Sequence, residues 1–281
     1  MTARMRRIDH PGAPAPERVR ALACNAVPLR VTLPAGQSLS AAATDALAGA
    51  GFAFGYLRLD GAAVRPLTFV TPAPAPGDGH AAWYSDTHRA PGGVTLRHAG
   101  AHLGLRDGRA FLHCHGNWQG TPDQPDCGHL LCDDTILDAD CTITGWGLHS
   151  AGLVASPDAE TAFTLFQPEA RPGGDTANAH LLSLRPNQDI RAALLAFARD
   201  RGITAARIEG IGSLVGTAFA DGRTLDSYAT EILIVGGRLQ DDAVTLDVAS
   251  VGFDGRGMAG RLAPGANAVC VTAEILIIAD A

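Results

Sequence analysis

The sequence predicts an α/β (α+β) fold made of two related units, each with a helix and a mixed sheet. Two observations indicate this fold class. An internal repeat appears when the segment from Leu33 is aligned with the segment from Leu184, at a constant offset of 151 residues (184 − 33). Strand-like apolar runs also follow a helical pattern in the second segment. The matching residues are Leu33, Gln37, Ala41, Ala42, Gly51 and Gly61 in the first copy, and Leu184, Gln188, Ala192, Ala193, Gly202 and Gly212 in the second.

Each copy is predicted to contain a short strand, a helix and a second strand, in that order. The helix begins near Ser38 in the first copy and near Asp189 in the second, because both residue types cap helix N-termini. Gly51 and Gly202 are the expected stops, since glycine tolerates the left-handed backbone that ends a helix. Further strands are expected in the second copy over the apolar runs 205–208, 231–235, 244–251 and 269–278.

The chain is acidic and contains no lysine. Its net charge is −7, and all 22 basic residues are arginine. The absence of lysine excludes a Schiff-base lysine, a P-loop lysine and a serine–lysine dyad. An acidic surface also argues against DNA as a partner, because non-specific DNA affinity depends on basic residues.

We expect a soluble, cytoplasmic protein. The longest apolar stretch, 268–279, is shorter than the roughly 20 residues that a bilayer span needs. No basic segment followed by a long apolar stretch opens the chain. The six cysteines lack a disulfide-like spacing, which suits a reducing compartment.

A His-x-His pair and a third histidine predict a metal site. On a strand, His113 and His115 point to the same face, and His129 at the start of the next apolar run can fold back beside them. Three neutral imidazoles with an open fourth position are the arrangement of catalytic zinc, so Zn²⁺ or another divalent transition metal is expected. Two alternatives stay open: the histidines are scattered over the surface, or Cys127 or Cys132 adds a thiolate ligand.

Three motifs in the second copy resemble the PPC (plants and prokaryotes conserved) domain. They are Gly210-Ile211-Gly212-Ser213, the run Thr230-Glu231-Ile232-Leu233-Ile234-Val235-Gly236-Gly237, and Gly260-Arg261-Leu262. The His-x-His and Gly-His-Leu motifs of the first copy are similar to the metal-site pattern of bacterial members. The resemblance implies a duplicated, PPC-like mixed-sheet fold related to α-acetolactate decarboxylase and to a zinc-dependent ester hydrolase. It also implies self-association, as a trimer or a dimer, and a DNA-binding label that derives from plant members with an AT hook, which this chain lacks.

The two copies differ at the residues expected to bind the metal. The segment 246–249 stands in place of 112–115, and Arg261 stands in place of His129. The carboxylate of the family motif is kept at Glu231 but aligns with Val94 in the first copy. We therefore expect one metal site, in the first copy alone.

These observations divide the chain into four segments. Residues 1–24 are expected to form a flexible arm, and 25–167 a PPC-like domain with the three-histidine site. Residues 168–179, rich in proline and glycine, form the predicted linker. Residues 180–281 form a degenerate PPC-like domain without a metal site.

Four residues are candidates for catalytic roles. Glu231 is expected to reach the metal across the domain interface as a general acid or base, although an edge-strand carboxylate is the alternative. Tyr84 and His88 lie in an insertion that the second copy lacks, which is either a lid over the site or a solvated loop. Arg97, or Arg89 in the insertion, is expected to bind a substrate carboxylate, because a guanidinium recognises carboxylate through two hydrogen bonds.

The leading functional hypothesis is a metal-dependent lyase, decarboxylase or hydrolase that acts on a small carboxylate- or carbonyl-bearing metabolite. One alternative is a DNA-associated regulatory protein with a structural metal. Another is a non-catalytic sensor of a metal or a metabolite. An open coordination position would favour the enzyme over both alternatives.

Overall fold

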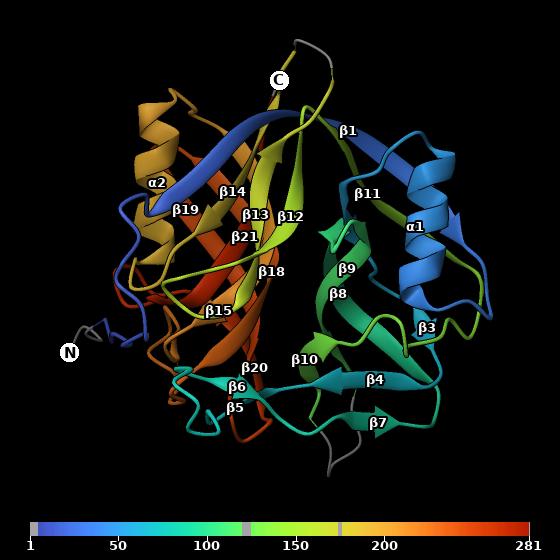
Figure 1. Cartoon of the computed structure of the whole chain (residues 1–281), viewed down its shortest axis with the longest axis horizontal. Coiled ribbons are helices and arrows are strands. Elements are labelled where there is room, and N and C mark those ends of the chain that lie inside the picture. The colour runs from blue at the N-terminus through green and yellow to red at the C-terminus, as the bar shows by residue number, and fades with distance from the viewer. Residues whose placement is uncertain (1–4, 120–124, 174–175, 281) are drawn as a thin grey trace.

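The computed structural model describes residues 5–119, 125–173 and 176–280. It consists mainly of β-strands, most of them in antiparallel pairs (Figure 1). Strands account for 54% of the chain and helices for 8%, so the predicted α/β class is wrong and the fold is β-rich. The reason lies in the connections. Two-residue turns at Asp107-Gly108 and Asp241-Asp242 join long neighbouring strands. Links this short impose antiparallel pairing, whereas parallel strands need crossovers of a dozen or more residues.

The elements follow one another in two halves, each with one helix. The first half contains β1 (Val19–Leu33), α1 (Leu39–Gly49), β2 (Gly55–Arg58), β3 (Ala63–Val64), β4 (Leu67–Val70), β5 (Pro72–Ala73), β6 (Trp83–Tyr84), β7 (His88–Ala90), β8 (Val94–Arg106), β9 (Arg109–Trp118), β10 (Cys127–Leu130), β11 (Cys141–His149), β12 (Ala151–Pro157) and β13 (Thr164–Ala170). The second half contains β14 (Ala179–Leu184), α2 (Ile190–Asp200), β15 (Ala206–Leu214), β16 (Thr217–Ala218), β17 (Thr224–Leu225), β18 (Thr230–Gln240), β19 (Ala243–Val251), β20 (Gly257–Arg261) and β21 (Val269–Ala279).

The two helices begin and end where the sequence predicts. Ser38 caps α1 and accepts a hydrogen bond from the Ala41 N–H, and Asp189 caps α2 in the same way. Gly51 and Gly202 follow the helices with φ of 88° and 65°, a backbone conformation that favours glycine. The helices thus keep the offset of the sequence repeat.

Strand β1 connects the two halves. Its first part, 19–24, pairs with β14 of the second half, and its remainder, 25–33, pairs with β11 of the first half. Figure 1 shows β1 arching between the regions that carry α2 and α1. The expected flexible arm over 1–24 is corrected for its described part, 5–24, because 19–24 is a paired strand and Ile8 is buried against the second half; residues 1–4 lie outside the described residues.

Each helix packs over its own core, and a third apolar cluster lies between the halves. The buried faces of α1 and α2 belong to separate clusters, which contain Leu47 and Leu194 respectively. The third cluster joins residues of both halves, among them Tyr56 and Leu276. Beside it, the Arg58 guanidinium donates to the fully buried Glu209 carboxylate at 3.0 Å. The halves therefore share a packed interface along β2, β8 and β15.

Among the described residues, no helix is both long and apolar enough to cross a membrane.

Candidate metal centre

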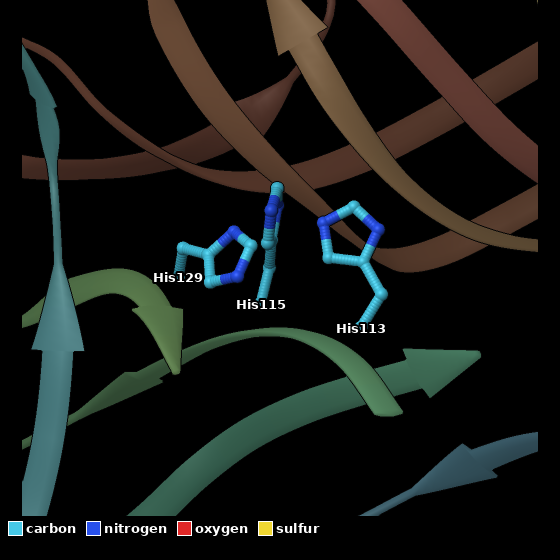
Figure 2. A group of neighbouring side chains, drawn as sticks. All are labelled: His113, His115 and His129. Atoms are coloured by element: carbon cyan, nitrogen blue, oxygen red, sulfur yellow. The ribbon is translucent and has the colours of Figure 1, made fainter. Parts of the chain in front are cut away.

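The fold brings the three predicted histidines together. His113 and His115 lie on one face of β9, and His129 on β10 is directly opposite His115 in the strand register. One ligand atom from each of the three residues lies within 4.8 Å of the others. Figure 2 shows the three rings side by side, all directed away from the strands that carry them toward strands of the second half. Imidazole nitrogens this close together match the spacing needed for one shared metal ion.

Two of the rings are oriented by groups of the second half. The His113 Nδ1–H donates to the Glu274 carboxylate of β21 at 2.6 Å, and the His115 Nδ1–H donates to the Ile232 carbonyl of β18 at 2.9 Å. Each bond leaves the Nε2 lone pair of its ring free. Hydrogen bonds of this kind set the tautomer of metal-binding histidines and hold the ring in place.

Burial keeps His115 and His129 neutral. Desolvation, and then the neighbouring His113, lower the pKa of His115 to about 3. The same causes hold the pKa of His129 well below its usual range, and the Nδ1 atom of His129 is buried without a hydrogen-bond partner among the described residues. A neutral imidazole with a free nitrogen is a metal ligand. The donor set therefore fits a divalent transition metal.

Glu231 lies beside the three rings. Its Oε1 atom is 3.9 Å from His115 Nε2 and 3.8 Å from His129 Nδ1. Burial raises the pKa of Glu231 to about 8, and its Oε2 atom has no hydrogen-bond partner among the described residues. A buried carboxyl without a partner is costly, and a cation at the centre of the histidines would offset that cost.

The three histidines open onto a cavity of about 420 Å³ between the halves. Glu231 and Glu274 lie at the same end of the cavity as the histidines, and phenylalanines 111, 163 and 166 line its walls. Tyr84 from the insertion contacts the His129 ring edge-on, with 5.4 Å between ring centroids. Desolvation of the phenol by burial, and then the negative charges of Glu231 and Glu274, raise the pKa of Tyr84. A cavity of this size suits a small molecule.

Not all of the predicted site residues reach this cavity. Tyr84 and Glu231 line it, whereas His88 stacks on Phe69 at 5.1 Å between ring centroids and stays outside it. Arg97, at a bulge in β8 between Leu96 and His98, is exposed and does not line the cavity either. Arg89, Cys127 and Cys132 are also absent from the cavity lining.

Two residues at the cavity were not predicted from the sequence. Glu274 orients His113, and Arg106 at the end of β8 is the arginine of the cavity lining. Glu274 is the lone carboxylate in the apolar run 268–279, and a charge in a buried strand was the signal that could have identified it. Arg106 carries no comparable signal, because its position depends on how β8 packs against the second half.

The strand register also corrects the comparison of the two copies. In the second half, β20 pairs with β19 such that Ala259 faces Ala249, as His129 faces His115 in the first half. Ala259 is thus the counterpart of His129, and Arg261 is instead ion-paired with Asp247 at 3.0 Å. Within the described ranges, the three histidines are the one group of His, Cys, Asp or Glu side chains close enough together to bind a metal ion.

Comparisons with known proteins place a family match in the second half. Residues 171–279 match the family described as the Plants and Prokaryotes Conserved (PCC) domain, in agreement with the PPC resemblance of the motifs there. None of the curated proteins matches the chain.

Several solved structures are similar to part of the chain. A metal-containing protein from Archaeoglobus fulgidus is 16% identical, with a TM-score of 0.40, and the match covers 50% of this chain and 92% of that one. A plant- and prokaryote-conserved (PPC) protein from Pyrococcus horikoshii is 15% identical, with a TM-score of 0.39, and the match covers 53% and 96%. A candidate DNA-binding protein from Bacteroides thetaiotaomicron is 22% identical, with a TM-score of 0.32 and coverage of 38% and 81%.

Proposed function

We propose that the chain is a metal-dependent enzyme, a lyase, decarboxylase or hydrolase, that acts on a small carbonyl- or carboxylate-bearing metabolite. The observation that carries this proposal is the open side of the histidine cluster. Three imidazoles line one end of a cavity of about 420 Å³, with the Glu231 carboxyl beside them. A structural site would instead be closed by four protein ligands.

Zinc is the metal we propose for this site. His113, His115 and His129 would hold it, and nitrogen ligands in a set of three are those of catalytic zinc. When bound, zinc supplies a Lewis acid that polarises a carbonyl oxygen or lowers the pKa of a water molecule.

The residues around the histidines have separable roles in this proposal. Glu231, with one oxygen free of protein partners, accepts or returns a proton at the reacting atom. Glu274 is a positioning residue, because it contacts His113 and holds that ring in one tautomer. Tyr84 covers the His129 side of the cavity.

We also propose that the chain is a tandem duplication of one PPC-like unit, over 25–167 and 180–281, related in fold to α-acetolactate decarboxylase. The equal offset of α1 and α2, their matching caps and the matching hairpins β8–β9 and β18–β19 support this proposal. The six free cysteines support a place in the reducing cytoplasm.

Metal analysis of the purified protein tests the site. We expect about one zinc per chain, and loss of that zinc in both His113→Ala and His129→Ala. His98→Ala is the matched control, because His98 lies on β8 outside the cavity lining. Two metals per chain, or full occupancy in His129→Ala, would refute the assignment.

Turnover tests the catalytic role. The zinc-loaded protein is assayed for hydrolysis of 4-nitrophenyl acetate and for decarboxylation of 2-acetolactate. We expect one of the two reactions, and a loss of about 100-fold or more in kcat for Glu231→Gln, which keeps the metal. Glu17→Gln, at an exposed glutamate, is the control. If Glu231→Gln retains full activity, Glu231 is not the acid or base.

A further inference from the structure

A continuous wall of aromatic rings leads from the metal end of the cavity to Arg106. The Phe166 ring meets His113 with 6.0 Å between centroids, and Phe111 meets Phe166 with 5.7 Å between centroids. The Arg106 guanidinium carbon then lies 5.3 Å from the centre of the Phe111 ring. All four residues line the same cavity. The cavity therefore has a polar end, an apolar middle and a cation at the far end of that wall.

The strand geometry gives the length of this wall. Phe111 and His113 lie two residues apart on β9, and side chains two apart share a face at a spacing of roughly 7 Å. Figure 2 shows His113 at one end of the row of three rings. Phe111 precedes it on the strand, so the wall continues from that end of the row. The Arg106 guanidinium stacks on Phe111, which itself stands roughly 7 Å along the strand from His113.

Arg106 is exposed at the cavity and contacts the Phe111 ring, and it has no hydrogen-bond or ion-pair partner among the residues that the structure describes. Other arginines near the interface do have partners: Arg58 pairs with Glu209, and Arg18 pairs with Glu160. A guanidinium at a cavity mouth without a carboxylate partner can bind an anion through two parallel hydrogen bonds. No protein carboxylate in the described ranges pairs with Arg106, so its guanidinium is available to a ligand carboxylate.

Other parts of the cavity lining are apolar as well. Trp83 and Phe163 face each other with 5.4 Å between ring centroids, and both line the cavity with Leu165. Hydroxyl or phosphate groups placed between these surfaces would lose their hydration without gaining hydrogen bonds. The middle of the cavity therefore selects a flat apolar group over a polyhydroxylated one.

We propose that the substrate is an aromatic carboxylic acid whose carboxylate binds Arg106, whose ring lies along Phe111 and Phe166, and whose reacting oxygen faces the three histidines. This inference rests on the proposed metal-dependent activity and names the substrate class of that same site. In it, Arg106 replaces Arg97 as the residue that binds the carboxylate.

The test uses three metal-binding probes on the full-length chain loaded with cobalt(II). Acetohydroxamate binds the metal alone, benzohydroxamate adds an aromatic ring, and 4-carboxybenzohydroxamate adds a carboxylate across that ring. Affinities are measured from the change in the visible spectrum of cobalt. We expect the ring and then the carboxylate each to tighten binding by about tenfold or more.

Two variants separate the role of Arg106 from a general effect of charge. Arg106→Met, which keeps an apolar contact with Phe111, should weaken 4-carboxybenzohydroxamate by about tenfold or more and leave benzohydroxamate unchanged. Arg109→Met, across the turn of the same hairpin and outside the cavity lining, should change neither affinity.

The outcomes distinguish this inference from the proposed function. If acetohydroxamate binds but the ring and the carboxylate add nothing, the substrate class is wrong and the open metal position stands. Equal losses in Arg106→Met and Arg109→Met would likewise overturn the role of Arg106. If no hydroxamate changes the cobalt spectrum, the open position is refuted, and both proposals fall together.

Discussion

Replacing Glu274 with glutamine should weaken zinc binding without changing the fold. Glu274 accepts a hydrogen bond of 2.6 Å from His113 Nδ1, and its side chain is 1% exposed. Glutamine has the same shape but removes the charge that strengthens this bond. Loss of such an orienting partner typically costs about 10- to 100-fold in metal affinity. That range corresponds to about 1.4–2.7 kcal/mol of binding free energy.

Competition with a chromophoric zinc chelator measures the effect. Wild type, Glu274→Gln and the control Glu169→Gln are titrated side by side, since Glu169 lies on β13 with its side chain 42% exposed. We expect weaker binding in Glu274→Gln alone, with thermal unfolding of the metal-free proteins unchanged. A zinc Kd within twofold of wild type for Glu274→Gln would show that Glu274 does not position His113, and the reasoning would be refuted.

Two further predictions follow from the charges of the chain. Burial opposes ionisation of Glu160, but hydrogen bonds from the Arg18 guanidinium and the Ala15 N–H lower the pKa of this carboxyl on balance. Ionised Glu160 therefore stabilises the fold above its unfolded pKa of about 4.3, and this stability is lost as the pH falls through the lower folded pKa. Arg18→Met should therefore lower the free energy of unfolding by about 3 kcal/mol at pH 7 and by less near pH 3, as measured by urea titration. An equal loss at both pH values would contradict this prediction. Because the net charge is −7, duplex DNA should bind weakly and without sequence preference at physiological salt, and a sub-micromolar, sequence-selective complex in a gel-shift assay would disprove this.

The local elements of the fold were predicted correctly from the sequence, but the fold class was not. Ser38 and Asp189 cap the helices as expected, because capping is decided by residues within one turn. The α/β prediction failed because it weighted one helix per copy and missed the long hairpins. The turns at Asp107-Gly108 and Asp241-Asp242 were readable signals of antiparallel strands.

The site was predicted in part. His113 and His115 share one face because side chains alternate along a strand. His129 approaches them because the next strand, β10, pairs antiparallel with β9. Glu231 lies 3.8–3.9 Å from nitrogens of the cluster, and its role as a general acid or base stays a prediction. The arginine was misplaced: Arg106 is four positions from His102, which pairs with His113, so it shares their face, whereas Arg97 is five positions from His102 and does not.

The sequence by itself determined what local spacing controls: where the helices begin and end, and which histidines share one strand face. It also determined the acidic charge and the absence of lysine. Only the tertiary structure decided which groups complete the site. Glu274 and Arg106 lie 161 and 7 positions from His113, yet both reach the same cavity. The physical reason is that β1 pairs with strands of both halves and the interface packs β8 against the second half, so distant side chains meet through packing rather than spacing.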